Sequence, residues 1–102
     1  MAKRASFSKQ DIDRQLIYQK NKCGFCRSDF DINITVSKNA DHKIPPQKFD
    51  AYLSVSEEET KKQFLLNDVR ADAKIDNDTS NLMILCAQCN NNKSDATYYE
   101  YI

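Results

Sequence analysis

Four cysteines form two pairs at the spacing of metal ligands. Cys23 and Cys26 stand in "CGFC", Cys86 and Cys89 stand in "CAQC", and there is no fifth cysteine. A CxxC segment offers two sulfurs from one tight turn, so two segments that meet can complete a tetrahedral zinc site. The 59 residues between the pairs (27–85) exceed the usual zinc-ribbon spacing, which leaves disulfides or a redox CxxC as alternatives. We expect structural zinc, because the N-terminus lacks the apolar segment of a secretory signal.

A single histidine, His42, directly follows Asp41. A lone histidine is more often structural than catalytic, so the residue type alone decides little. An imidazole can nevertheless take a proton from water near neutral pH. The neighbouring carboxylate is a hard oxygen ligand of the kind that Mg²⁺ or Mn²⁺ prefers. Adjacent residues of an ideal strand point to opposite faces, so we expect this pair where a strand bends or ends.

Three consecutive asparagines follow the second cysteine pair in "LCAQCNNNK". If the segment from Ala87 is helical, one face carries residues at i, i+3, i+4 and i+7: Cys86, Cys89, Asn90 and Lys93. Asn91 and Asn92 are turned away from Asn90 by about 100° and about 200°. Asn90 is therefore the asparagine that can share the face of the cysteines. Lys93 either contacts a substrate phosphate or favours the C-terminal end of its helix.

The same residues form a longer series along the chain. Its members are Cys23-x-x-Cys26, Asp41-His42 before Ile44-Pro45, Asn81-Leu82, and Leu85-Cys86-x-x-Cys89-Asn90-x-x-Lys93. This series resembles the HNH endonucleases of the zinc-knuckle type, which have a ββα-metal core. The resemblance covers residues 7 to 96 or so, and it is specific because all these segments must coincide.

The resemblance implies a role for each matching residue. His42 would be the general base, Asp41 and Asn90 would hold a catalytic Mg²⁺ or Mn²⁺, and Asn81 would position the base or its loop. The four cysteines would hold a separate structural zinc ion. Many family members have histidine where Asn90 stands, so the chain resembles the asparagine variant, like the HNH domain of the CRISPR effector nucleases. The implied activity is hydrolysis of DNA phosphodiester bonds, leaving 5′ phosphate and 3′ hydroxyl ends.

Basic side chains indicate where nucleic acid could bind. Residues 1–48 carry ten Lys or Arg and five acidic residues, whereas residues 49–102 carry five Lys or Arg and ten acidic residues. The net charge is therefore +5 in the N-terminal half and −5 in the C-terminal half. This asymmetry either makes a basic face for phosphate or is a chance drift of solvated charge. Lys93 and Lys43 are the candidate substrate-binding residues. Further candidate contacts to the DNA backbone are Lys3, Arg4, Lys9, Lys20, Lys22, Arg27, Lys38 and Lys48.

Two other functions compete with the nuclease. The first is a non-catalytic zinc-stabilised module that binds nucleic acid or protein, with His42 and Asn90 serving structure. The second is a thiol oxidoreductase built on a CxxC pair. The coincidence of Asp41, His42, Asn81 and Asn90 favours the nuclease, with double-stranded DNA as substrate. One centre cuts one strand at a time, so a double-strand break requires a homodimer, a larger assembly or two encounters.

Composition places the chain among globular proteins. It has 102 residues, of which 40% are hydrophobic and 29% charged, with a net charge of zero. We expect a single α+β domain over 1–102. No apolar run approaches the roughly 20 residues of a membrane span. We therefore expect a soluble, unsecreted protein. The resemblance to HNH endonucleases implies a cytoplasmic protein of a bacterium or phage, in a setting such as restriction or phage defence.

Several elements should position these residues. "FSKQDI" predicts a helix within 1–22 that begins after Ser8, with Ile12, Leu16 and Ile17 as its apolar stripe. "INITV", at 32–36, and "NADHKI" read as extended segments, the second ended by the double proline at 45–46. "LMIL", at 82–85, reads as a buried apolar run, followed by one last helix from Ala87 into "TYYEYI".

The connection between His42 and Asn81 is longer than the compact core requires. Its excess, an insertion of about residues 47–78, should contain an acidic helix over 56–73 that begins after Ser56. Phe64, Leu65 and Val69 should form the buried side of that helix. The helix either binds a partner, mediates dimerisation or shields misplaced DNA, or is merely solvated.

Overall fold

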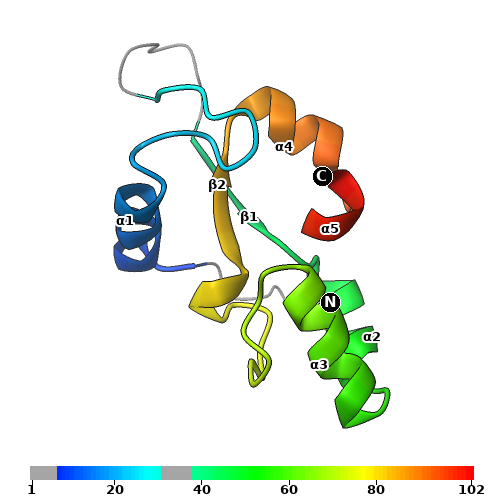
Figure 1. Ribbon diagram of the computed structural model, residues 1–102. Coiled ribbons are helices and arrows are strands. Elements are labelled where there is room, and N and C mark those ends of the chain that lie inside the picture. The colour runs from blue at the N-terminus through cyan, green and yellow to red at the C-terminus, as the bar shows by residue number, and fades with distance from the viewer. Residues whose placement is uncertain (1–6, 31–37) are drawn as a thin grey trace, which may run out of the picture.

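Short helices surround a two-stranded sheet in the computed structural model, which describes residues 7–30 and 38–102 (Figure 1). The predicted strand at 32–36 lies outside these residues. The elements in chain order are α1 (Lys9–Tyr18), β1 (Asn39–His42), α2 (Pro46–Leu53), α3 (Glu57–Leu66), the 3₁₀ turn η1 (Thr79–Asn81), β2 (Leu82–Leu85), α4 (Ala87–Lys93) and α5 (Tyr98–Tyr101). The fold is therefore a small α+β domain. Within the described part, every helix is too short or too polar to cross a lipid bilayer.

The sheet and the helix after it form the centre of the molecule. β1 pairs antiparallel with β2 in a register that sets His42 opposite Leu82. All four residues of β2 are buried, as the apolar run predicted. α4 follows β2 directly and contacts both strands. The chain thus brings the end of β1, which carries His42, against the helix that carries Asn90.

Helix α1 covers the other side of β2. Its predicted start is confirmed, because the hydroxyl of Ser8 accepts a hydrogen bond from the Asp11 N–H at 3.0 Å. Ile12 and Leu16 pack against the core that contains β2. Ile17, however, is 78% exposed, so its place in the apolar stripe was wrong. A position next to Leu16 is turned by about 100° on a helix and leaves the buried face.

The buried side chain of Gln19 ties the end of α1 to β2. Its Nε2 donates to the Ile84 carbonyl and its Oε1 accepts from the Ile84 N–H, both at 3.0 Å. The Gly24 N–H also donates to the Ile84 carbonyl, at 2.9 Å. These bonds satisfy backbone groups on the edge of β2 that a two-stranded sheet leaves unpaired. They also fix the cysteine loop of residues 20–30 beside the strand.

The insertion folds into a separate helical unit, visible at the lower right of Figure 1. It contains α2, which the sequence analysis did not predict. The double proline was read as the end of an extended segment, but Pro46 is the first residue of the helix, where a missing N–H costs nothing. Phe49 of α2 stacks on Phe64 of α3 with ring centroids 4.7 Å apart. Ile44, Val69 and Ala73 complete this second core.

The acidic helix α3 is shorter than predicted. Ser56 caps its start as expected, accepting from the Glu59 N–H at 3.3 Å. The helix ends at Leu66 because Asp68 adopts a left-handed φ of 56° and the Val69 N–H turns back to the Phe64 carbonyl at 2.9 Å. Phe64 and Val69 are buried as predicted. Leu65, at 65% exposure, was wrongly assigned to the buried side.

The last predicted helix is two helices. α4 ends at Lys93 because Ser94 takes a left-handed φ of 50°. A new helix, α5, begins after Thr97, whose side chain and that of Glu100 form a reciprocal capping box. The break directs α5 back toward the cysteine loop, where Tyr98 stacks on Phe25 with ring centroids 5.4 Å apart.

Candidate metal centre and active site

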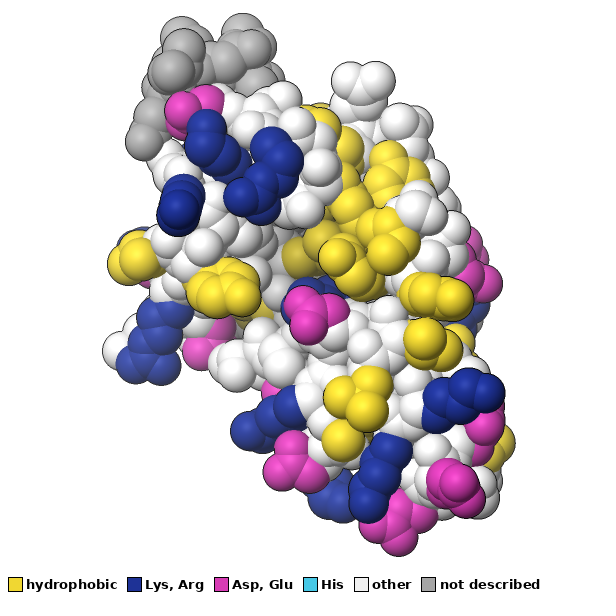
Figure 2. Space-filling model, viewed as in Figure 1, with side chains coloured by type: hydrophobic (Ala, Val, Ile, Leu, Met, Phe, Trp, Pro, Cys, Tyr) yellow, Lys and Arg dark blue, Asp and Glu magenta, His cyan; other side chains and the backbone are white. Residues whose placement is uncertain are grey.

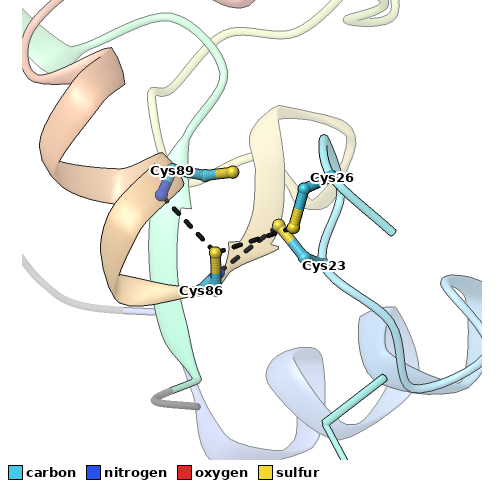
Figure 3. Close-up of side chains that lie close together, drawn as sticks. All are labelled: Cys23, Cys26, Cys86 and Cys89. Carbon is cyan, nitrogen blue, oxygen red and sulfur yellow. Dashed lines mark hydrogen bonds between the residues drawn. The ribbon is translucent and has the colours of Figure 1, made fainter. Parts of the chain in front are cut away.

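The four cysteine side chains converge on one point between the loop of residues 20–30 and the start of α4 (Figure 3). Their sulfur atoms all lie within 4.8 Å of one another, and those of Cys26 and Cys86 are 3.7 Å apart. Tetrahedral zinc with Zn–S bonds of about 2.3 Å separates its sulfurs by about 3.8 Å. The four cysteines can therefore hold a zinc ion with little rearrangement.

Backbone turns hold the sulfurs in place. In the first pair, the Cys23 N–H donates to the Ser28 carbonyl at 2.9 Å, and Arg27 adopts a left-handed φ of 64° that closes the loop. In the second pair, Cys86 is the N-cap of α4, and its sulfur accepts from the Cys89 N–H at 3.5 Å. The Cys86 N–H in turn points to the Cys23 sulfur at 3.4 Å. This hydrogen bond connects the first cysteine pair to the second.

The pKa values of the cysteines indicate how a bound cation would act on the cluster. Burial raises the pKa of Cys86 and raises that of Cys89 to about 12. The hydroxyl of Ser28, by contrast, lowers the pKa of Cys26 to about 6. Zinc binds thiolates, so four charged sulfurs must share this small volume. A divalent cation supplies the charge that makes such a state favourable.

Asp41, His42 and Lys93 form a second polar group, at the end of β1. The Asp41 Oδ1 accepts from the His42 N–H at 2.8 Å, so the carboxylate folds back over the strand end. Lys93 reaches this point from α4: its Nζ donates to the His42 carbonyl at 2.8 Å and lies 3.0 Å from the Asp41 Oδ2. His42 is the last residue of β1, in agreement with the prediction that the pair lies where a strand ends.

Lys93 is the least expected member of this group. Its side chain has an exposure of 0%, whereas lysine is almost never fully buried unless paired. The helical phase correctly put it on the face of Cys89, but in this structure its ammonium is directed to Asp41 rather than to solvent. Lys43, the other candidate phosphate ligand, is also engaged: its Nζ donates to the Asp68 carbonyl at 2.8 Å.

The loop after His42 is locked by Asn81, whose side chain is fully buried. Its Oδ1 accepts from the Ile44 N–H at 2.8 Å, and its Nδ2 donates to the carbonyls of Ile44 and Asp76 at 3.0 and 2.9 Å. These bonds use both donors and the acceptor of the amide. The geometry suits a residue that holds the loop rather than one that touches a substrate.

The imidazole of His42 packs between groups that the sequence analysis did not single out. Its Nε2 lies 2.8 Å from the Asn77 Oδ1 and 4.0 Å from the Asp76 Oδ1. Its ring also faces that of Phe7, with centroids 4.8 Å apart. Asp76 and Asn77 begin "DNDTSN", which was interpreted only as turn chemistry. The available signal was that this turn directly precedes Asn81, the residue expected to position the base.

Asn90 is half-buried on α4, one turn before Lys93. Within residues 7–30 and 38–102 its side-chain amide makes no hydrogen bond, and it does not contact Asp41 or His42 by one. The Asp41 Oδ2 is buried and, among the residues that the structure describes, accepts no hydrogen bond, although Lys93 neutralises it as an ion pair. A carboxylate and a carboxamide are oxygen ligands of the type that Mg²⁺ or Mn²⁺ prefers, but Asp41 is engaged by Lys93 in this structure.

The surface around the cysteine loop is shown in Figure 2. Lys and Arg side chains gather over this loop, while α2 and α3 below carry both signs of charge. An apolar patch lies between them over α5, where Phe25 contacts Tyr98 and Tyr101. No histidine side chain is visible on this face, so His42 is not exposed beside these basic side chains in this view.

The fold and the cysteine cluster define a small α+β domain with a candidate zinc site. Comparisons with protein-family models, with curated proteins and with solved structures find no match for this chain. A functional assignment therefore depends on the residues themselves and on their geometry.

Proposed function

We propose that the chain is a metal-dependent endonuclease of the HNH type, which hydrolyses DNA phosphodiester bonds with His42 as general base. One observation carries this proposal: His42 ends β1 beside the Asp41 Oδ2, which is buried and, within the described part of the chain, accepts no hydrogen bond and pairs only with Lys93. Phosphodiester hydrolysis needs a base for the attacking water and an oxygen ligand for a metal ion near it. Both groups stand next to each other in the chain and at the contact of β1 with α4.

The strand order supports the same proposal. An antiparallel pair of strands followed directly by a helix is the order expected of a ββα-metal core. In this arrangement Asp41 and Asn90 would hold Mg²⁺ or Mn²⁺. Such an ion, when bound, neutralises charge that grows on the phosphate and on the leaving oxygen. His42 accepts the proton of the attacking water, and Asn81 holds the loop that follows the base.

The structural zinc has a separate task in this proposal. Cys86 is the N-cap of α4, so zinc bound by the four cysteines fixes the start of the helix to the loop after α1. Asn90 follows within one turn of Cys86 and Cys89. The position of Asn90 relative to Asp41 then depends on zinc, and zinc removal should abolish activity by misplacing Asn90.

The buried Lys93 favours a second candidate function, a non-catalytic zinc module that binds nucleic acid or protein. Its ammonium already neutralises Asp41 at 3.0 Å, which is the charge that a divalent ion would otherwise supply. If this pair is permanent, Asp41 serves structure and binds no metal. The two functions differ in one respect that is easily measured, because the module retains DNA or protein without hydrolysing it.

The proposed substrate is double-stranded DNA, contacted by basic side chains on the cysteine loop. Lys43 and Lys93 are paired within the protein, so phosphate contacts would come from exposed residues such as Lys20 and Arg27. A single centre nicks one strand, and paired breaks would require a homodimer or a larger nuclease assembly. Restriction or phage defence is a setting that fits such an activity.

Supercoiled plasmid distinguishes the two functions. Purified protein is incubated with the plasmid and with Mg²⁺, Mn²⁺ or Ca²⁺ in parallel, at low and moderate salt. The nuclease converts supercoiled DNA to nicked circles with Mg²⁺ or Mn²⁺ and leaves it intact with no added ion. A gel shift without any nicking under these conditions would instead support the non-catalytic module. Lys62→Ala, an exposed change on α3, serves as a control that should cut like the wild type.

A further inference from the structure

The single histidine is held by a loop that belongs to the insertion. The side chain of His42 is 22% exposed, and its Nε2 lies 2.8 Å from the Asn77 Oδ1. Its Nδ1 makes no hydrogen bond within residues 7–30 and 38–102. The two ring nitrogens of the imidazole are thus in different surroundings, and this difference selects between the two neutral tautomers.

The partner on Nε2 decides which nitrogen carries the proton. An amide oxygen only accepts hydrogen bonds, so contact with the Asn77 Oδ1 requires a proton on Nε2. The opposite orientation of the amide would direct an N–H at Nε2 and move the proton to Nδ1. The Asp76 carboxylate, 4.0 Å from Nε2, disfavours that alternative. A negative charge attracts an N–H and repels a lone pair, so it stabilises the form protonated at Nε2.

The loop around Asn77 is braced on both sides. Before it, the Asp76 carbonyl accepts from the Asn81 Nδ2 at 2.9 Å. After it, the Asp78 carboxylate accepts from the Ser80 hydroxyl at 2.8 Å and forms an ion pair with Arg70 at 2.6 Å. Asp78 is buried, and the bonds from Ser80 and Arg70 outweigh burial and lower its pKa. Asn77 therefore approaches His42 from a fixed backbone.

We propose that Asn77 is a positioning residue that holds His42 in the tautomer protonated at Nε2 and leaves the Nδ1 lone pair as the base. The tautomer follows from the geometry alone, whereas its catalytic use rests on the proposed nuclease function. In that reaction Nδ1 takes one proton from water as the water oxygen bonds to phosphorus, the P–O3′ bond breaks, and the leaving 3′ oxygen takes a proton from solvent. Nε2 keeps its own proton, and the Asn77 oxygen and the Asp76 carboxylate stabilise the positive charge of the imidazolium.

Nitrogen NMR tests the tautomer directly, because the chain has one histidine and its ring signals need no assignment. Two-bond ¹H–¹⁵N spectra of ¹⁵N-labelled protein are recorded at about pH 8.5, where an ordinary imidazole is neutral. Wild type should show one tautomer, with Nε2 protonated and Nδ1 bare. Asn77→Ala should show both tautomers in exchange, while Asn77→Asp, which keeps an acceptor, should retain the wild-type pattern.

The control is Asn91→Ala, which removes the same amide from an exposed position of α4 and should leave the spectrum unchanged. A wild-type ring protonated at Nδ1 overturns the proposal without any variant. An unchanged tautomer in a folded Asn77→Ala protein overturns it as well. If Asn77→Ala does not fold, Asn77→Ser, which keeps a short acceptor, replaces it and should show an intermediate mixture.

Cleavage kinetics separate this inference from the nuclease proposal. If wild type nicks plasmid, Asn77→Ala should lower kcat on the order of tenfold to a hundredfold with little change in KM, and Asn77→Asp should keep most of kcat. Equal kcat in Asn77→Ala refutes the positioning role but not the nuclease. A protein that never nicks DNA yet shows the locked tautomer refutes the nuclease and leaves the role of Asn77 standing.

Discussion

Replacing Lys93 with methionine tests the polar group at the end of β1. The substitution keeps the length and apolar stem of the side chain but removes the ammonium that lies 3.0 Å from the Asp41 Oδ2. Because Lys93 is fully buried and Asp41 is only 21% exposed, the carboxylate would be left largely desolvated without a counter-charge. We therefore expect Lys93→Met to destabilise the protein strongly in the absence of a divalent ion.

The size of the effect follows from the distance. Opposite unit charges 3.0 Å apart attract by about 5.5 kcal/mol at an effective dielectric constant of about 20. Breaking a buried pair by removing one partner costs about 3–5 kcal/mol in measured cases, because a buried charge stays behind. The hydrogen bond from Lys93 to the His42 carbonyl is lost as well. We expect a loss of about 3 kcal/mol or more in the free energy of unfolding.

Urea unfolding followed by circular dichroism measures this loss, with zinc content held equal in all samples. Lys61→Met is the matched control, because Lys61 pairs with Glu57 at 3.2 Å on the exposed face of α3. Such surface pairs contribute about 0.3–0.5 kcal/mol, so the control should remain close to wild type. The double variant Asp41→Asn with Lys93→Met should recover much of the stability, since it removes both charges of the pair and leaves neither one buried alone.

Magnesium provides the second half of the experiment. If Asp41 is a metal ligand, Mg²⁺ should stabilise Lys93→Met more than wild type, because the ion replaces the missing positive charge. Titration calorimetry should then show tighter Mg²⁺ binding to the variant. A loss of stability below about 1 kcal/mol would refute the reasoning, since the pair would then contribute no more than a surface pair does.

Three further predictions concern zinc, the asparagines and acid. The wild-type protein should contain about one zinc ion per chain, and Cys86→Ser should lose it. This variant should also lose most of its helical circular dichroism, because structural zinc contributes on the order of 10 kcal/mol to folding. Metal analysis that finds full zinc in Cys86→Ser would contradict the site. Asn90→Ala should lose Mg²⁺-dependent nicking, whereas Asn92→Ala should keep most of it, and equal rates in a plasmid assay would remove Asn90 from the site. The Thr97 backbone N–H and the Lys48 ammonium lower the pKa of Glu100 from 4.5 to about 2. The charged carboxylate of Glu100 therefore stabilises α5 above about pH 4.5, and this stabilisation is lost as the pH falls toward 2. The gap in melting temperature between wild type and Glu100→Gln should therefore narrow from pH 5 to pH 2, and a constant gap would show that Glu100 contributes nothing through its charge.

Local patterns predicted the starts of helices and the convergence of the cysteines. Ser8 and Ser56 cap α1 and α3 as expected, because a cap depends on residues only three positions apart. The two CxxC pairs meet although 59 residues (27–85) separate them. That meeting could be predicted because four cysteines without a fifth need a common ligand, whatever fold brings them together.

The ends of helices were harder to predict from the sequence. α3 ends at Leu66 because Asp68 accepts a left-handed φ, a conformation that glycine usually marks. Ser94 ends α4 in a similar way, again without glycine. The insertion around 47–78 was predicted to contain one acidic helix with a buried side, whereas it contains two helices, and Phe49 and Phe64 give it a core of its own. Packing between distant segments overrides local preference at these places.

In the candidate site, too, local patterns predicted part of the arrangement and contacts between distant residues determine the rest. Helical phase placed Lys93 on the correct face of α4, but its burial depends on Asp41, which lies 52 positions earlier (93 − 41). Asn77 was interpreted as a turn residue, because nothing in its surroundings along the chain indicates a histidine 35 positions away. Contacts of this kind follow from tertiary structure, and they supply the testable roles of Lys93 and Asn77.

The most direct test of the central claim is single-turnover nicking of supercoiled plasmid by wild type and by His42→Ala, both with Mg²⁺. Zinc content and unfolding transitions must match, so that lost activity reports the base and not the fold. The proposed mechanism predicts that wild type nicks the plasmid and that His42→Ala is slower by roughly 10²–10⁴-fold, the usual contribution of a general base. Equal rates for the two proteins, or no nicking by either one, would contradict it.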